Sequence, residues 1–568
     1  MQTPVQTTLF DMHNKMSIDE RGAVFTKPEV VDFILDLVGY DPARNLAGQR
    51  LLEPACGHGE FVVAAIDRLM ASFKRHGGTT ATANRDLRDA IRAVEAHEAS
   101  ARETGARVVD RLALYHDLSV KQAESLAAAW IVVGDFLLAD LPAAFDYVVG
   151  NPPYVRQELI PDDLLVIYRQ RFTSLYNRAD LYVPFIERGL NLLSAEGKLC
   201  YICSDRWMKC AYGKPLRAMV AKNFHLDAFV DMVDTPAFQS AVIAYPAITL
   251  LSRLRVAHNG TLTAYRPSID RATLRPLARA LLGNEQTTPA GVQHLEGVVD
   301  AHHPWLLDSK ARLAVVRELE ARLPLLEEAG CKVGIGVATG CDRAYIGDYK
   351  GLDVEASRKL PLVMASDIRS GRIEWDGNGI INPFERDGAL AALEVYPKFG
   401  RFIRARADLL KARNVAKRSG EGWYRTIDRI WHDLTTTPKL LIPDIKGEAN
   451  VVFDDGHFYP HHNLYWVTSS TWDLQALQCV LRSAVAKAFV ATYCVKMAGG
   501  FLRFQAQYLR RIRVPQWDTV NAAQRRVLVS AAKSLNQGDI DHAVFDLYGM
   551  SADQRKVLLD FHNGHGTE

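Results

Sequence analysis

The sequence has no run of 18 apolar residues, and its N-terminus lacks the basic, apolar and small-residue pattern of a secretory signal. We therefore expect neither a membrane-spanning segment nor export, and we predict a cytoplasmic protein. Net charge is nearly absent as well, since 68 Lys and Arg residues oppose 66 Asp and Glu residues and leave +2. Any surface that binds a nucleic acid must therefore be a local one.

Paired cysteine motifs are also missing. The eight cysteines are scattered, which is typical of free thiols in a reducing compartment. Cys200 and Cys203 form a C-x-x-C, but no second pair matches them and both lie in the apolar run 199–203. We interpret them as buried strand positions and predict no metal site.

What the sequence does contain is a regular alternation of strand-like and helical patterns from about residue 20 to about residue 255. The strand-like runs are 50–53, 91–95, 130–133, 145–150, 199–203, 226–230 and 247–251, and the helical runs are 61–73, 181–193 and 215–224. This alternation predicts an α/β fold with a Rossmann-like, doubly wound and largely parallel sheet.

The length of 568 residues exceeds what one ordinary core accommodates, so we expect several domains. The predicted segments are an N-terminal extension, the α/β domain, a turn-rich connector, a second domain of α+β type and a helical tail. Their expected bounds are 1–19, 20–256, 257–299, 300–515 and 516–568.

The tetrapeptide Asn151-Pro152-Pro153-Tyr154 follows the predicted strand 145–150, at the edge where open α/β sheets carry their chemistry. The two prolines stiffen the turn and remove N–H groups, which leaves it rich in acceptors. The Asn151 side-chain oxygen and the Pro152 carbonyl can both accept hydrogen bonds from an aromatic NH2 group and make its nitrogen nucleophilic. The Tyr154 ring can stack on a flat base. The alternative is an ordinary turn between strand and loop.

A strand, a glycine-bearing turn and a helix start follow one another over residues 51–61. Gly57 and Gly59 let the backbone approach a ligand closely. The third glycine of the dinucleotide fingerprint is missing, and Glu53 at the strand end would repel a pyrophosphate. Glu53 suits instead the ammonium group of S-adenosylmethionine.

Two further strand ends complete a candidate cofactor site. Glu95 ends the next strand, where such sheets grip ribose hydroxyls, and Glu98 is the competing candidate. Asp135 and Phe136 follow the third strand and suit an adenine amine and its ring face; a solvated carboxylate and a core ring are the alternatives. The order of these features on successive strands favours the cofactor site.

Together, these residues resemble the gamma-class, TaqI-like, N6-adenine-specific DNA methyltransferases of restriction-modification systems. Gly22 to Pro28, Asp180-Leu181-Tyr182 and Tyr212-Gly213-Lys214 also resemble motifs of that family. The resemblance implies methyl transfer from S-adenosylmethionine to a flipped adenine, directly and without a metal. It implies cofactor contacts from Thr26, Glu53, Pro54, Ala55, Gly57, Gly59, Glu95, Asp135, Phe136 and Asn151. It also implies a catalytic role for Asn151, Pro152, Pro153 and Tyr154, with Tyr154 and Phe238 stacking on the target base.

The second domain resembles the target-recognition domain of that family at 334–346, 423–425, 439–444 and 503–515. Nine basic residues oppose three acidic ones between Arg401 and Arg429, and five basic residues occur without any acidic one between Lys496 and Arg513. Aromatic residues, among them Phe501, are interleaved with these charges, which suits contact with phosphates and bases. A charged run is more often a solvated face. With the catalytic motifs present, we predict double-stranded DNA as the partner, contacted by Arg413, Lys417, Arg418, Arg425, Arg503, Arg510 and Arg511.

Two alternatives stay open at this point. Methyltransferases that act on rRNA guanine or protein glutamine also resemble N-P-P-Y proteins, although they usually lack a basic domain of this size. The chain could instead be a restriction nuclease or a DNA-binding specificity subunit, because Pro443-Asp444-Ile445-Lys446 contains a D-x-K, but no convincing companion carboxylate precedes it. No nuclease-like extension precedes residue 20, so we expect any cognate restriction endonuclease to be encoded separately.

Overall fold

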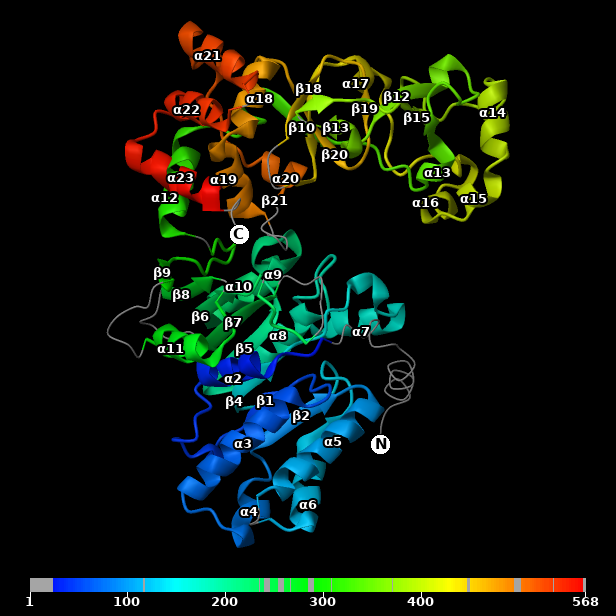
Figure 1. The fold of residues 1–568 in the computed structure, drawn as a ribbon. Coiled ribbons are helices and arrows are strands. Elements are labelled where there is room, and N and C mark those ends of the chain that lie inside the picture. Colours follow the sequence, from blue (N-terminus) through cyan, green and yellow to red (C-terminus); the bar gives the residue numbers. More distant parts are fainter. Residues whose placement is uncertain are drawn as a thin grey trace. The chain divides into compact units, whose positions relative to one another are not determined.

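In the computed structural model, the chain divides into unit 1, Met1–Lys310, and unit 2, Ala311–Glu568 (Figure 1). The described residues are 24–115, 118–233, 235–239, 246–253, 260–265, 267–283, 291–307, 309–369, 371–446, 450–494, 502–534 and 536–564. The expected N-terminal extension 1–19 lies outside them, as do Gly22, Lys496 and Phe501.

Unit 1 is built on a nine-stranded sheet in the order β3-β2-β1-β4-β5-β7-β6-β8-β9. The strands are β1 (Leu51–Glu53), β2 (Ile91–Glu95), β3 (Ile131–Val133), β4 (Phe145–Gly150), β5 (Leu193–Ser204), β6 (Phe224–Asp231), β7 (Pro246–Arg253), β8 (Gly260–Tyr265) and β9 (Gln293–Glu296). β1 to β5 pair in parallel, whereas β7 lies antiparallel between β5 and β6. The predicted doubly wound α/β fold is confirmed. The strand order reverses between β1 and β4, which is where such sheets bind ligands.

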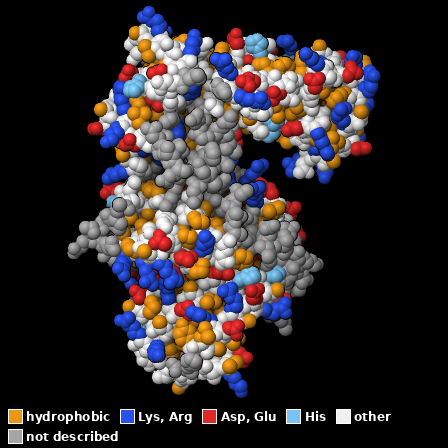
Figure 2. Space-filling model, viewed as in Figure 1, with side chains coloured by type: hydrophobic (Ala, Val, Ile, Leu, Met, Phe, Trp, Pro, Cys, Tyr) orange, Lys and Arg blue, Asp and Glu red, His pale blue; other side chains and the backbone are white. Residues whose placement is uncertain are grey.

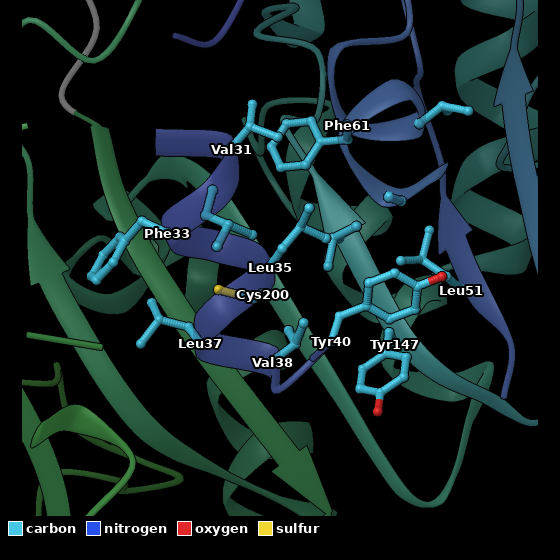
Figure 3. Close-up of a cluster of buried hydrophobic side chains, with 14 of the residues drawn as sticks. Val31, Phe33, Leu35, Leu37, Val38, Tyr40, Leu51, Phe61, Tyr147 and Cys200 are labelled. Atoms are coloured by element: carbon cyan, nitrogen blue, oxygen red, sulfur yellow. The ribbon is translucent and has the colours of Figure 1, made fainter. Parts of the chain in front are cut away.

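Helices cover both faces of this sheet, because its central strands are apolar on both sides. Leu51 packs into one core with helix α2, and the adjacent Leu52 packs into the opposite core with α8. Figure 3 shows the first core, where side chains of α2 lie beside Leu51, Tyr147 and Cys200. The helices of unit 1 are α2 (Pro28–Val38), α3 (Glu60–Arg75), α4 (Thr80–Asp86), α5 (Glu98–Ala113), α6 (Val120–Trp130), α7 (Asp162–Arg171), α8 (Tyr182–Asn191), α9 (Arg206–Lys209), α10 (Lys214–Asn223) and α11 (Arg271–Leu281). Cys200 and Cys203 are buried in β5, as predicted.

The segment 257–299 differs from the expected connector, because it contributes β8, α11 and β9 to unit 1. β8 pairs in parallel with β6 and extends the sheet. Its core-facing side chains include Thr261 and Thr263, whose buried hydroxyls donate to backbone carbonyls. Polar strand residues satisfied in this way hide the apolar alternation on which strand prediction depends. The turn-forming residues Gly260, Pro267, Gly283 and Gly291 lie at the ends of these elements and between them.

Unit 2 mixes short strands with helices, in agreement with the predicted α+β type. Two four-stranded sheets have the orders β10-β20-β16-β18 and β11-β15-β12-β19, and two pairs are β13-β14 and β17-β21. The strands are β10 (Cys331–Ile335), β11 (Ile346–Asp348), β12 (Lys359–Val363), β13 (Ile368–Arg369), β14 (Arg372–Ile373), β15 (Asn378–Ile381), β16 (Lys439–Pro443), β17 (Ile445–Lys446), β18 (Val452–Asp454), β19 (Tyr459–Pro460), β20 (Leu464–Ser469) and β21 (Leu502–Arg503). The helices are α12 (Lys310–Arg322), α13 (Asp342–Tyr345), α14 (Pro397–Arg404), α15 (Ala407–Lys411), α16 (Asn414–Lys417), α17 (His432–Thr436), α18 (Leu474–Arg482), α19 (Ala484–Tyr493), α20 (Ala506–Leu509), α21 (Ala522–Ala532), α22 (Gln537–Tyr548) and α23 (Ala552–Gly564).

Positive and negative side chains are mixed on the face of the molecule shown in Figure 2. Among the described residues, no single helix is long and apolar enough to span a membrane. The consecutive helices α18 and α19 reach the necessary length and apolar character only when taken together, and they are bent by 62° at their junction. Most of their side chains are buried in unit 2.

Candidate functional site

A pocket opens at the carboxyl ends of β1, β2, β3 and β4, where the strand order of the sheet reverses. Its empty volume is about 1320 Å³, which includes open solvent at the mouth. Ten of the predicted site residues line it: Thr26, Glu53, Pro54, Ala55, Gly57, Glu95, Asp135, Phe136, Asn151 and Pro153. Gly59, Pro152, Tyr154 and Phe238 are not among the described residues that line this pocket.

The Glu53 side chain lies at the floor of the pocket and is only 2% exposed. Its Oε2 atom is buried without a hydrogen-bond partner among the described residues. Burial, together with the nearby Glu60 and Glu95 carboxylates, raises the pKa of Glu53 well above 4.5. A cationic group placed beside Glu53 would lower this pKa and stabilise the carboxylate.

The turn after β1 brings the backbone close to the pocket. Gly57 and Gly59 both have positive φ, at 51° and 85°, and Gly59 is the N-cap residue of α3. A Cβ atom at Gly59 would lie 2.8 Å from Thr104 Cγ2, so this turn requires glycine for both backbone and packing reasons. Gly59 therefore shapes the turn, while Gly57 contacts the pocket.

The structure places Glu95, and not Glu98, at the pocket. The two carboxylate oxygens of Glu95 accept hydrogen bonds from the backbone N–H groups of Gly57 and His97, each at 2.9 Å. These bonds fix the carboxylate and leave lone pairs that can accept hydrogen bonds from hydroxyl groups. Glu98 is the first residue of α5 and is not among the described lining residues.

Asp135 and Phe136 lie on the opposite wall, after β3. The Asp135 carboxylate accepts a hydrogen bond from Leu137 N–H at 2.9 Å and another from the Tyr168 hydroxyl. The Phe136 ring centroid lies 4.9 Å from that of Phe185. A carboxylate acceptor beside two aromatic rings suits a flat heterocycle that carries an amine.

The Asn151 side-chain amide is hydrogen-bonded through its nitrogen atom, whereas its oxygen atom has no partner among the described residues. Its Nδ2 atom donates to the Val24 carbonyl at 2.8 Å and to Thr26 Oγ1 at 3.3 Å. Because a carbonyl oxygen can only accept a hydrogen bond, the Val24 carbonyl must face the Asn151 Nδ2 group, and this contact fixes the orientation of the amide. Asn151 Oδ1 is left buried with no partner among the described residues. The amide oxygen is therefore an oriented acceptor at the pocket.

Tyr154 and Phe238 approach each other beside the tetrapeptide, with ring centroids 6.5 Å apart at an interplanar angle of 81°. Phe238 is placed by the N-terminal segment, since it forms an isolated β-bridge with Thr26 and its neighbours bond to Phe25 and Lys27. The rings are perpendicular, so stacking of both on one base requires one ring to turn.

Sequence reasoning missed a whole wall of the pocket. The missed lining residues come from the segment after the tetrapeptide and from α7, and they are Val155, Leu159, Ile160, Pro161, Leu164 and Tyr168. Phe25 and His58 also line the pocket, and their rings meet edge to face with centroids 4.5 Å apart. The available signal was the set of apolar residues in 155–168, directly after the tetrapeptide.

The predicted DNA-contacting residues of unit 2 form two groups, which differ in how far they interact with the rest of the unit. Arg413 is occupied by the protein itself, because its guanidinium donates to the carbonyls of Thr339, Leu410, Trp423 and Arg425 at 2.9–3.0 Å. Arg503 and Arg510 are ion-paired with Asp444 and Glu327. These three arginines interact within unit 2, and Arg510 is exposed as well, so their role as DNA contacts stays a prediction.

The remaining candidates are better placed for a partner. Lys417, Arg418 and Arg511 are exposed, and Arg425 is half-buried. Arg511 lies 5.0 Å from the Tyr493 ring centroid. Lys496, which belonged to the same basic run, is outside the described residues. The pairing of Asp444 with Arg503 also accounts for the D-x-K aspartate without a nuclease role.

Two family profiles match the chain. The Eco57I restriction-modification methylase profile matches residues 110–238, which include the tetrapeptide, and the TaqI-like C-terminal specificity domain matches residues 361–514. These matches confirm the family resemblance.

Two relatives are similar over nearly their whole length. The chain is 54% identical to the type II methyltransferase M.PaeR7I of Pseudomonas aeruginosa, over 98% of this chain and 96% of the relative. It is 53% identical to the type II methyltransferase M.XhoI of Xanthomonas vasicola, over 95% and 99%.

Solved structures support the fold. The restriction-modification enzyme MmeI, solved in complex with DNA, superimposes with a TM-score of 0.63 at 12% identity, over 99% of this chain and 78% of the other. A nuclease-deletion mutant of the restriction-modification enzyme LlaGI gives a TM-score of 0.52 at 12% identity, over 90% and 46%. With a pocket whose acidic residues Glu53, Glu95 and Asp135 fit the cofactor, the chain belongs to the type II methyltransferases of restriction-modification systems and methylates DNA with S-adenosylmethionine as the methyl donor.

Proposed function

We propose that the methyl group is transferred to the exocyclic N6 amine of adenine in double-stranded DNA. The observation that supports this most directly is the oriented Oδ1 atom of Asn151 after β4, which has no hydrogen-bond partner in the described part of the chain. An amide oxygen next to a proline carbonyl provides two acceptors for one NH2 group. Hydrogen bonds from that group draw its lone pair out of the ring and make it a better nucleophile.

On the cofactor side, each residue has a role that its geometry supports. Glu53 would pair with the ammonium group, Glu95 would accept the ribose hydroxyls, and Asp135 would accept the adenine amine while Phe136 packs on the ring. When bound, S-adenosylmethionine supplies an activated methyl group and its own leaving group. The protein therefore contributes mainly by orienting the two reactants.

On the target side, Tyr154 and Phe238 form an aromatic pair that can hold a base removed from the duplex. Extrusion of a base costs a few kcal/mol, so the enzyme must grip the surrounding DNA elsewhere. The specificity domain of unit 2 supplies the surface for that grip.

The test is methyl transfer from labelled S-adenosylmethionine to duplex DNA, ribosomal RNA and total protein in parallel, followed by nucleoside analysis. We expect N6-methyladenine in DNA alone. Label in another base would contradict the adenine assignment, and label only in RNA or protein would favour the alternative methyltransferase classes. Metal-dependent cleavage of unmethylated DNA would revive the nuclease alternative.

We further propose that a separately encoded restriction endonuclease recognises the same DNA sequence. The type II relatives support a partnership of this kind. Plasmid DNA modified by this protein should resist that endonuclease, and digestion of fully modified plasmid would contradict the pairing.

Glu95→Ala is expected to weaken S-adenosylmethionine binding by about tenfold or more, because a positioned acceptor for two hydroxyl groups is lost. Glu98→Ala is the matched control, since it removes a carboxylate at the start of the neighbouring helix and should leave affinity nearly unchanged. Isothermal titration with the cofactor measures both. The reverse ranking would assign the ribose contact to Glu98.

Replacement of both Lys417 and Arg418 by alanine is expected to reduce the salt dependence of DNA binding. Each lost phosphate contact lowers the slope of log K against log[salt] by about 1, so the slope should fall by about 2. Arg526 and Lys533, exposed basic residues in and after α21, give the control pair. Equal slopes for the variant and the wild-type protein would remove these two residues from the DNA interface.

A further inference from the structure

Three side chains that are distant in sequence converge in unit 2. Asp342 begins α13, and His461 and His462 lie between β19 and β20 (Figure 1). One potential ligand atom from each of the three lies within 4.8 Å of the other two. The cluster belongs to neither the methyl-transfer pocket nor the basic segment.

The backbone around this cluster is held by strand-like pairing. Val337 forms a parallel bridge with His461, and His462 N–H donates to the Val337 carbonyl at 3.0 Å. His461 N–H donates to the Val363 carbonyl at 3.0 Å. At Gly336, an added Cβ would lie 2.2 Å from the His461 carbonyl oxygen, so the two segments are in direct backbone contact. These contacts fix the backbone of both histidines.

The carboxylate is oriented as well. Thr339 Oγ1 donates to Asp342 Oδ1 at 2.5 Å, which directs the other oxygen, Oδ2, toward His461 Nε2 at 3.2 Å. Two ligands that are each about 2.0–2.1 Å from a tetrahedral ion are about 3.3 Å apart. The observed separation therefore fits two ligands of one metal ion as well as it fits a hydrogen bond.

The imidazoles carry unsatisfied nitrogen atoms. The Nδ1 atoms of His461 and His462 are both buried without a partner among the described residues. His461 as a whole is only 2% exposed. The two ring centroids are 4.0 Å apart. Of the two Nδ1 atoms, only His462 Nδ1 can serve an ion that also contacts His461 Nε2, because the two nitrogens of one imidazole point apart. Buried imidazole nitrogens are normally paired.

Access and ligand chemistry decide the kind of ion. The Asp342 side chain is 48% exposed, so an ion can reach the cluster and keep a water ligand. Two imidazoles and one carboxylate suit borderline divalent metals such as Zn²⁺, Co²⁺ or Ni²⁺, whereas Mg²⁺ and Ca²⁺ prefer oxygen ligands only.

We propose that Asp342, His461 and His462 bind one divalent metal ion of the zinc class. The ion would join the segment after β10 to the segment before β20 and so stabilise the framework of the specificity domain. The prediction of no metal site considered only cysteine pairs, and it did not include ligands separated by 119 positions. The proposal does not depend on which base is methylated.

The test uses the full-length chain without a histidine tag, stripped with a chelator and then titrated with Zn²⁺ by calorimetry and with Co²⁺ by visible d–d absorption. We expect one ion per chain and a thermal midpoint that rises with Zn²⁺. Asp342→Asn and His462→Gln should each weaken binding more than about tenfold. His542→Gln replaces an exposed histidine of α22 and should bind as the wild-type protein does.

Both variants replace partly exposed side chains by residues of similar shape, and metal-free melting curves establish that they fold. Loss of binding in a variant whose metal-free melting is normal supports the site. Absence of stoichiometric Zn²⁺ binding by the wild-type protein, or equal affinity in all four proteins, would overturn it.

Discussion

Asn151→Ala is expected to reduce the rate of methyl transfer by about 10²–10³-fold at saturating cofactor and DNA. Removal of one positioned hydrogen-bonding group from a reacting centre has an effect of this order. In this protein the lost atom is Oδ1, which is buried, oriented and otherwise unpaired among the described residues. Single-turnover transfer of labelled methyl groups to duplex DNA measures the effect.

Cofactor affinity should change much less in the same variant. Asn151 Nδ2 holds the pocket-lining segment at Val24 and Thr26, and each neutral hydrogen bond contributes about 0.5–1.5 kcal/mol. A decrease of no more than about tenfold in cofactor affinity is therefore expected. Asn191→Ala, an exposed asparagine at the end of α8, is the control. Wild-type turnover by Asn151→Ala would falsify the assignment of the amine acceptor.

The second large effect is expected from Glu53→Gln, which should weaken S-adenosylmethionine binding by about 2–5 kcal/mol. Truncation of one partner of a buried, hydrogen-bonded charge pair has this cost. Glutamine keeps the shape of the side chain but cannot neutralise the ammonium group. Isothermal titration with the cofactor measures the loss, and Glu124→Gln, an exposed glutamate of α6, is the control.

The same variant should be at least as stable as the wild-type protein when no cofactor is bound. The pKa of Glu53 is raised by burial, so the folded state holds its proton more tightly than the unfolded state does. Stability of the cofactor-free protein therefore falls as pH rises above about 4.5, and Glu53→Gln removes this decrease. Thermal midpoints of both proteins across this pH range give the comparison. A variant that melts below the wild-type protein at neutral pH would show that Glu53 has a structural role instead.

The pocket residues at the strand ends were predictable because each of their motifs is local. Glu53, Glu95 and Asp135 end or follow strands that can be recognised from runs of three to six residues, and parallel strands bring their carboxyl ends to one edge. The turn at Gly57 and Gly59 is likewise visible in neighbouring residues. The stretch 257–299 was misjudged, because the buried threonines of β8 hide its apolar alternation.

The sequence by itself determined the doubly wound sheet, the position of the tetrapeptide and the acidic residues at the strand ends, since periodicity, glycine turns and proline stiffening act over a few residues. Only the tertiary structure decided which partners those residues have. Asn151 is oriented by Val24 from 127 positions away, and Arg413 is occupied by Thr339 from 74 positions away. His461 meets Asp342 across 119 positions. Contacts over such separations depend on how whole elements pack, and no local pattern in the chain encodes them.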